Sequence, residues 1–259
     1  MGEVVKGSSA SRLREADYRA LLELETTRLG GVEIGDLDAE IPHLPGWTVH
    51  SVVGHTAWVC RYVTQSLQAT PQDPPSRSSV GEPPVGPDVL MWYAEATQAL
   101  REEVATVDLA QIRPTWTGPQ PGDWWLRRLS HELAVHRWDV AAATSTDPDG
   151  PEPIDAALAL DGVDEVLEVF VPNRMQFDTL AGSGETIHLH ATDIEHGEWL
   201  LQLGPHAVSW EHRHAKGDVA VRAAASDLQL LLWGRIPPDR LEVFGDQMIL
   251  SRWQAAAAF

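Results

Sequence analysis

The sequence predicts a two-domain α+β protein, in which an all-helical first domain precedes a small domain that mixes strands and helices. Two observations predict this. Up to about residue 171 apolar residues recur at helical spacing, whereas after about residue 178 they fall in short, partly alternating runs separated by Gly, Pro and acidic turns. A chain of 259 residues is long enough for two domains. We therefore expect a helical domain over residues 11–177 and an α+β domain over residues 178–259.

The helical domain is predicted from five apolar-periodic segments that are bounded by Gly, Pro or Ser-rich loops. Gly30-Gly31 is expected to stop the first helix, Thr48 to cap the second, and Pro87 to lie in the first turn of the third. The predicted segments are 11–30, 49–68, 87–107, 123–143 and 153–171.

The second domain is predicted from its short runs. Strand chemistry is found in "ETIHLHAT", "EWLLQLG", "AVSWEH" and "DVAVRAAA". The stretch "SDLQLLLWGR" indicates a helix with Ser226 as its cap, and "LEVFGD" and "QMILSRW" close the chain.

Composition excludes several classes of partner. The formal net charge is −19, from 38 acidic and 19 basic residues, and a field of that sign repels nucleic-acid phosphates. No basic patch is present for anionic membranes, no apolar run approaches the ~20 residues of a membrane span, and the N-terminus lacks a signal-peptide core. The single cysteine, Cys60, allows no internal disulfide. We expect a soluble cytoplasmic protein that binds neither nucleic acid nor membrane, in an oligomeric state that the sequence does not give.

The stretch "RLSHELAVHRWDVAAAT", residues 128–144, places ionisable groups within an apolar helical run. His131 and His136 are five residues apart and diverge by about 140° on a helix, so they do not form the HExxH metal motif. Glu132 and His136, at i and i+4, do share a face and offer a carboxylate and an imidazole to one point. These are two metal ligands that lack a third.

His55 is the best candidate for the third ligand, because it lies mid-helix in "SVVGHTAWVCRY" among small apolar residues. Packing 49–68 against 123–143 would bring His55 to Glu132 and His136. Three protein ligands with an open position are typical of a catalytic divalent metal. The alternative is that each side chain is a hydrogen-bonded polar group of the core.

The stretches "LPGWTVHSVVGHTAW" and "ELAVHRWDV" resemble the DinB-like four-helix metal domain, in its mycothiol-dependent maleylpyruvate isomerase branch. The strand-rich tail that ends in "LLLWGR" resembles the small sterol-carrier-like domain that follows in that branch. The pattern is a Trp, a His eight residues later and an ExxxHRxD helix, matched here by Trp47, His55, Glu132, His136, Arg137 and Asp139.

The resemblance implies a bound zinc ion that activates the thiol of mycothiol or a related small thiol. Cys60 lies five residues after His55, on another helix face, and is more simply a small core residue, so the thiol is expected to be imported. The family uses an arginine in the C-terminal stretch near the site, and Arg235 matches it by motif as a clamp for a carboxylate. The equal alternative for Arg235 is a helix-end arginine.

Other polar residues are expected to have structural roles. Arg137 and Asp139 are expected to form an internal ion pair or to support the ligands. The alternating pairs His188 with His190 and His212 with His214 could make a second metal site. No carboxylate accompanies them at ligand spacing, which favours the polar faces of strands.

Two classes of function follow from these residues. The first is a zinc- and thiol-dependent enzyme acting on a small electrophile, ranked first as an S-transferase or thiol-exchange enzyme and second as a cis-trans isomerase of the maleylpyruvate type. The transferase is ranked ahead because an isomerase substrate would be a small dianion, for which Arg235 is the only plausible clamp. The second class is a non-catalytic binding protein for an apolar ligand.

Overall fold

The computed structural model describes residues 12–148, 150–175, 180 and 182–257. It comprises a helical unit, Arg14–Glu152, and a C-terminal unit that begins at Pro153. The α+β class is therefore confirmed. The expected boundary at 177/178 lies outside the described residues, and the chain divides earlier because the helix that follows Pro153 packs on α8 (Ala225–Leu232) of the C-terminal unit.

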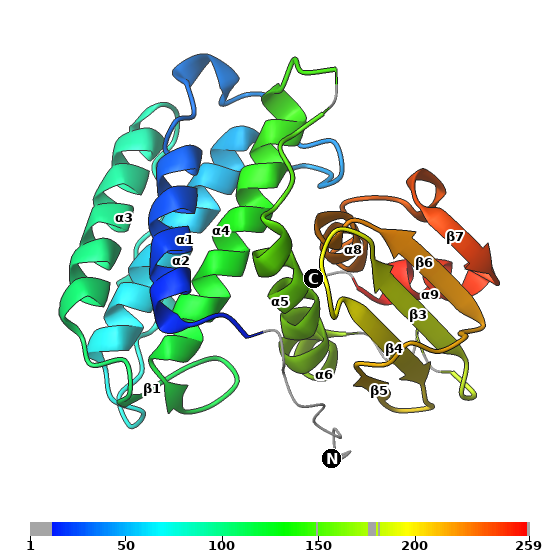
Figure 1. Ribbon diagram of the computed structural model, residues 1–259. Coiled ribbons are helices and arrows are strands. Elements are labelled where there is room, and N and C mark those ends of the chain that lie inside the picture. Colours follow the sequence, from blue (N-terminus) through cyan, green and yellow to red (C-terminus); the bar gives the residue numbers. More distant parts are fainter. Residues whose placement is uncertain (1–11, 149, 176–179, 181, 258–259) are drawn as a thin grey trace. The chain divides into compact units, whose positions relative to one another are not determined.

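The helical unit is built from the long helices α1, α2, α3 and α4, which Figure 1 labels. α1 contacts α4, and α2 contacts both α3 and α4. A two-stranded hairpin and two short 3-10 turns occupy the connections. The elements are α1 (Glu15–Leu29), η1 (Ile34–Asp36), α2 (Val49–Gln68), η2 (Arg77–Ser79), α3 (Asp88–Thr106), β1 (Ile112–Arg113), β2 (Gln120–Pro121) and α4 (Asp123–Thr144).

Local signals explain the helix that will carry His55. Thr48 caps α2 as predicted, because its side chain accepts a hydrogen bond from the Ser51 amide. Val49 lies one turn before Val52 and Val53, and all three are fully buried, so one face of α2 enters the core.

α4 carries charged residues into the core. Between Trp125 and Val140, every position of α4 except Glu132 is buried, and several of these positions are charged. Each of those charges therefore requires a partner.

The C-terminal unit begins with one continuous helical segment: α5 (Ala156–Glu165), the π-turn η3 (Val166–Phe170) and α6 (Val171–Arg174). A mixed sheet of strand order β5-β4-β3-β6-β7 follows, in which only β3 and β6 run parallel (Figure 1). The remaining elements are β3 (Thr186–Ala191), β4 (Glu198–Leu203), β5 (Val208–Glu211), β6 (Val219–Ala223), α8, η4 (Pro238–Arg240), β7 (Glu242–Gly245) and α9 (Gln247–Ala256).

The two faces of this sheet differ. Ile187, Leu189, Val219 and Val221 are buried at alternate positions, and α8 contacts the two strands that carry them, so they form the core face. His188, His190 and Glu198 occupy the opposite phase of β3 and β4. His190 lies directly across from Glu198 in the ladder.

The prediction that Ser226 caps the helix of "SDLQLLLWGR" is wrong. α8 begins at Ala225 with Ala224 at its N-cap, which forms no side-chain cap hydrogen bond. The Ser226 hydroxyl instead accepts a hydrogen bond from the amide of Ile154 at 3.0 Å, which ties the start of the C-terminal unit to α8.

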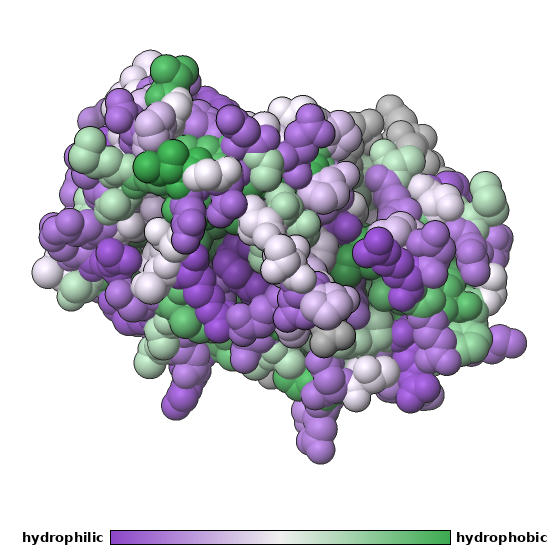
Figure 2. All heavy atoms as spheres, turned by 90° about the horizontal axis from the view of Figure 1, so that it is seen from above, coloured by the Kyte–Doolittle hydropathy of each residue, from purple (hydrophilic) through white to green (hydrophobic). Residues whose placement is uncertain are grey.

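Surface properties follow the composition. The face drawn in Figure 2 is mostly hydrophilic, and its hydrophobic residues form small separate patches. Among the described residues, no helix combines the length and apolar character that a membrane span requires.

Candidate functional site

The candidate site lies where α2 meets α4. His55 projects from α2, and Glu132 and His136 project from one face of α4, one turn apart. The Glu132 Oε1 atom lies 2.8 Å from His55 Nε2 and 3.5 Å from His136 Nε2. One ligand atom from each residue lies within 4.8 Å of the others, so the three, called the triad below, converge on one point.

Each of the two α4 residues of the triad is held by a second contact. Arg128, one turn before Glu132, donates a hydrogen bond to Glu132 Oε2 and thereby leaves Oε1 toward the two imidazoles. The buried carboxylate of Asp139 lies 2.9 Å from His136 Nδ1 through Oδ2, and 2.6 Å from His43 Nε2 through Oδ1. These contacts fix the orientation of both groups before any ligand arrives.

The charges of the triad are strongly shifted. Burial raises the pKa of Glu132, but Arg128 and the hydrogen bonds with His136 and His55 outweigh burial and hold this pKa well below its ordinary value. Burial lowers the pKa of His136, but the hydrogen bonds with Asp139 and Glu132 outweigh burial and raise this pKa to about 9. The metal-free site at neutral pH therefore holds a carboxylate and an imidazolium.

The site is open on the His55 side. The side chain of His55 is 36% exposed, against 16% for Glu132 and 10% for His136, so a ligand can reach the point where the three converge. Trp47 covers both imidazoles: its ring meets His55 edge-on with centroids 5.4 Å apart and stacks on His136 at 6.3 Å. An aromatic wall of this kind excludes water from one side of the site.

Two family models match consecutive parts of the chain. Residues 18–141 match the mycothiol maleylpyruvate isomerase N-terminal domain, and residues 157–252 match the MDMPI C-terminal domain. The chain belongs to the mycothiol maleylpyruvate isomerase family. The maleylpyruvate isomerases after which the family is named are enzymes.

Solved structures agree on the fold. The crystal structure of the mycothiol-dependent maleylpyruvate isomerase superposes with a TM-score of 0.64 at 16% identity, covering 89% of this chain and 93% of that chain. A histidine-to-alanine mutant of the same enzyme gives a TM-score of 0.65 at the same identity and coverage. The comparison with curated protein sequences gives no match.

The motif that carries the family resemblance contributes beyond the triad. Asp139 supports His136, as expected of one of the two residues that flank this ligand. Arg137 instead forms a buried ion pair with Glu25 at 3.1 Å and donates to the carbonyl of Glu152. Its role is therefore to hold α1 and the end of the helical unit against α4.

Two other candidates in the helical unit are structural. His131 is fully buried and meets the ring of Tyr18 edge-on at 6.5 Å. Cys60 is also fully buried, and burial, reinforced by the charge of Glu132, raises the pKa of its thiol to about 12. A thiol with this pKa carries almost no thiolate at neutral pH, so Cys60 is a core residue and not a nucleophile.

Arg235 belongs to the C-terminal unit, whereas the triad belongs to the helical unit. It follows the end of α8, where its guanidinium donates to the carbonyl of Trp233 at 2.9 Å and lies 5.8 Å from the centre of that ring. These contacts fit the helix-end interpretation, and the carboxylate clamp stays a prediction.

Sequence reasoning missed two groups that hold the triad. Arg128 stands at i and i+4 with Glu132, so the helical spacing was a usable signal. His43 precedes α2 in a connection between helices, and its contact with Asp139 spans 96 positions of the chain, so no local pattern could indicate it.

Proposed function

We propose that this protein is a metal-dependent enzyme that uses mycothiol, or a related low-molecular-weight thiol, as its nucleophile. The observation that carries the proposal is the convergence of His55, Glu132 and His136 on a point open to solvent. It is supported by membership in a family named for mycothiol.

The triad suits zinc. Two imidazoles and one carboxylate are the donor set of a recurrent class of catalytic zinc site, which keeps a further position for water or substrate. The donor atoms already lie within 4.8 Å of one another, so small side-chain rotations bring them to bonding distance of one ion. His55, Glu132 and His136 would hold the metal, which would lower the pKa of a bound thiol so that thiolate forms at neutral pH.

The chain's own residues prepare the site for this chemistry. Arg128 engages one carboxylate oxygen of Glu132 and presents the other. Asp139 engages Nδ1 of His136 and thereby directs Nε2 of that ring toward Glu132. Because Cys60 is buried, the thiol must come from a separate molecule, which is the role that we assign to mycothiol or a relative.

Two reactions can use the same thiolate. In an isomerase it adds to the cis double bond of an oxo-diacid, the bond rotates, and the thiolate leaves. In an S-transferase it attacks an electrophilic carbon and forms a C–S bond, the leaving group departs with its bonding electrons, and the thiol stays attached as a thioether. The family name favours the isomerase, whereas the net charge of −19 disfavours a small dianionic substrate and favours transfer to an uncharged electrophile.

The alternative of a different class, a carrier of an apolar ligand, has less support. The C-terminal unit holds a cavity of about 450 Å³, and six of its seven lining residues carry ionisable side chains: Leu160, Glu195, His196, Glu198, His212, Arg213 and His214. This pocket is the support for a carrier, whereas the triad and the family name both favour an enzyme.

Thiol consumption distinguishes these functions. The zinc-loaded protein is incubated with mycothiol and either maleylpyruvate or an uncharged alkylating electrophile, while free thiol and products are followed. We expect turnover that is lost in His136→Ala. An unchanged concentration of free thiol together with isomerised product indicates the isomerase. A loss of free thiol equal to the amount of product formed indicates the transferase. No turnover with either substrate, or zinc uptake that His55→Ala with His136→Ala does not reduce, would contradict the proposal.

A further inference from the structure

A second group of potential ligands lies in the C-terminal unit. His188 and His190 project from β3, Glu198 projects from β4, and His214 follows β5 in the connection to β6. One donor atom from each of the four lies within 4.8 Å of the others. The triad and its supports all belong to the other unit, so this His3Glu cluster is a separate feature.

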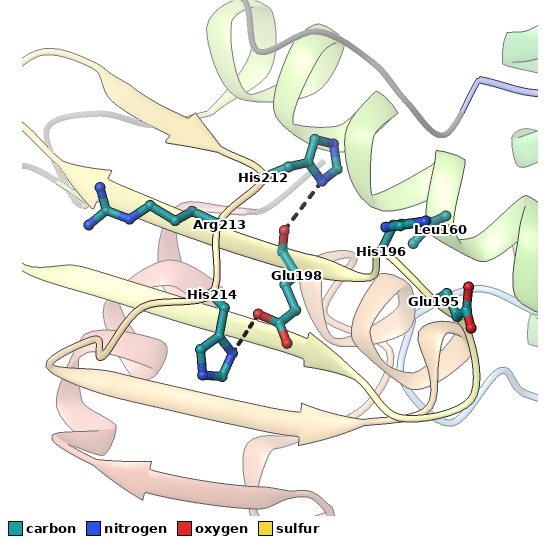
Figure 3. Close-up of a pocket in the computed structure, with 7 residues that line it drawn as sticks. All are labelled: Leu160, Glu195, His196, Glu198, His212, Arg213 and His214. Carbon is teal, nitrogen blue, oxygen red and sulfur yellow. Dashed lines mark hydrogen bonds and ion pairs between the residues drawn. The ribbon is translucent and has the colours of Figure 1, made fainter.

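Glu198 is the centre of the His3Glu cluster. Its Oε1 atom lies 2.8 Å from Nδ1 of His190. Its Oε2 atom lies 2.6 Å from Nδ1 of His214, and Figure 3 shows this second contact. His188 Nε2 faces the same carboxylate but is 3.6 Å from Oε2, which is too long for a hydrogen bond. Three imidazole nitrogens therefore converge on one carboxylate that satisfies only two of them.

The unsatisfied atom is buried. His188 is 7% exposed, and among the described residues its Nε2 has no hydrogen-bond partner. Buried polar atoms are rarely left in this state, and when they are, an ion or water that binds there is a standard explanation. The nitrogen points at the centre of the cluster, so the missing partner belongs at the point that the other three ligands also face.

Neighbouring charges do not oppose a cation there. Arg222 lies beside His190 in the parallel ladder, but its guanidinium is paired with Glu242 at 3.5 Å. His212 is directed elsewhere, to the buried carboxylate of Asp164 at 3.1 Å and the backbone carbonyl of Glu198. The only carboxylate of the cluster is thus available to a metal.

We propose that His188, His190, Glu198 and His214 form a second site for a divalent transition metal, with zinc as its natural occupant. Three imidazoles and one carboxylate are borderline-soft N/O ligands, which zinc accepts in tetrahedral geometry. Zinc bonds of about 2.0–2.1 Å separate neighbouring ligand atoms by about 3.3 Å. The ligand atoms of the cluster lie within 4.8 Å of one another, and the two nitrogens hydrogen-bonded to Glu198 lie 2.6 and 2.8 Å from its oxygens, so zinc would draw the distant atoms together and replace these two hydrogen bonds.

Four protein ligands make this a closed structural site, unlike the three-ligand triad. The ligands come from two adjacent strands and from a connection whose His214 side chain is 78% exposed. The metal would therefore fasten the β5–β6 connection to the outer face of the sheet, beside the cavity that Glu198 and His214 line.

The test uses the full chain with the triad disabled, as His55→Ala with His136→Ala, so its result does not depend on the proposed function. After chelator treatment, zinc chloride is titrated by calorimetry and melting curves are recorded. We expect about one zinc per chain and a higher melting temperature with zinc. Adding His214→Ala or Glu198→Gln should weaken binding at least about tenfold, since even outer-shell changes cost that much.

His206→Ala is the matched control, because His206 is another exposed histidine of the same unit and lies outside the cluster. It should bind zinc like the parent. His214 is largely exposed, so His214→Ala is expected to fold, which circular dichroism checks. The proposal is overturned if the folded triad-disabled protein takes up no zinc, or if His214→Ala and Glu198→Gln bind zinc as tightly as the control. Either result would mean that the four residues form a hydrogen-bonded cluster and do not bind zinc.

Discussion

Replacing Asp139 by Asn tests how the candidate site is built. Asp139 is fully buried, and its two oxygens contact His136 Nδ1 at 2.9 Å and His43 Nε2 at 2.6 Å. Asp139→Asn keeps the size of the side chain and removes its charge. The imidazole of His136 then loses the charged acceptor that raises its basicity, and its tautomer is no longer fixed, because an amide can accept or donate a hydrogen bond.

The expected effect is a 10- to 100-fold loss of zinc affinity, or about 1.4 to 2.7 kcal/mol, as for other groups that support a metal-bound histidine. The size depends on pH. Asp139 also helps to raise the pKa of His136 to about 9, so in the wild type protons compete with zinc more strongly below that pH. The loss of zinc affinity caused by Asp139→Asn should therefore reach its full size at pH 9 and be smaller at pH 7.

The assay is a chelator-buffered zinc titration at both pH values, on a background of Glu198→Gln with His214→Ala, which removes two of the four ligands of the His3Glu cluster. Glu25→Gln is the control, because Glu25 is an equally buried carboxylate of the same unit that pairs with Arg137. The reasoning is refuted if folded Asp139→Asn binds zinc like its parent at pH 9, or if Glu25→Gln loses as much affinity.

Three further outcomes are expected. With the His3Glu cluster disabled by Glu198→Gln and His214→Ala, zinc uptake by the triad at pH 7 should release about one proton, because the pKa of His136 near 9 keeps it protonated without metal. Calorimetry in buffers of different ionisation enthalpy counts that proton, and a zinc affinity that does not change between pH 7 and 9 would argue against it. Cys60→Ala should keep its turnover and lose about 1 kcal/mol of unfolding free energy in urea, whereas inactivity of the folded variant would refute an imported thiol. Arg235→Ala should lower kcat/KM at least about tenfold with partial recovery in Arg235→Lys, and unchanged kinetics would return Arg235 to a helix-end role.

Helical elements with clear local signals were predictable. The segment 49–68 coincides with α2, because Thr48 provides a cap and the buried valines follow helical spacing. The pairing of Glu132 with His136 followed from the i, i+4 geometry alone, and His55 was found because a histidine among buried apolar residues requires a partner. These inferences depend on periodicity within one element.

The remaining features depend on contacts between distant segments. Glu198 was overlooked as the carboxylate beside His188 and His190 because only the β3–β4 register brings it across from His190. Ser226 was misassigned as a cap because its hydroxyl is used by Ile154, 72 positions away. Local sequence indicates the helix or strand face on which a side chain lies. It does not indicate which residue from a distant segment will bind that side chain.

The binding of a small thiol at the triad is tested most directly on protein in which cobalt(II) replaces zinc, again with the His3Glu cluster disabled by Glu198→Gln and His214→Ala. A thiolate on cobalt gives a charge-transfer absorption that water, imidazole and carboxylate ligands do not. Addition of mycothiol should produce this band in the protein with the disabled His3Glu cluster, and not after His136→Ala is added. A cobalt-loaded, folded protein whose spectrum stays unchanged at saturating mycothiol would contradict a thiol-dependent metal site.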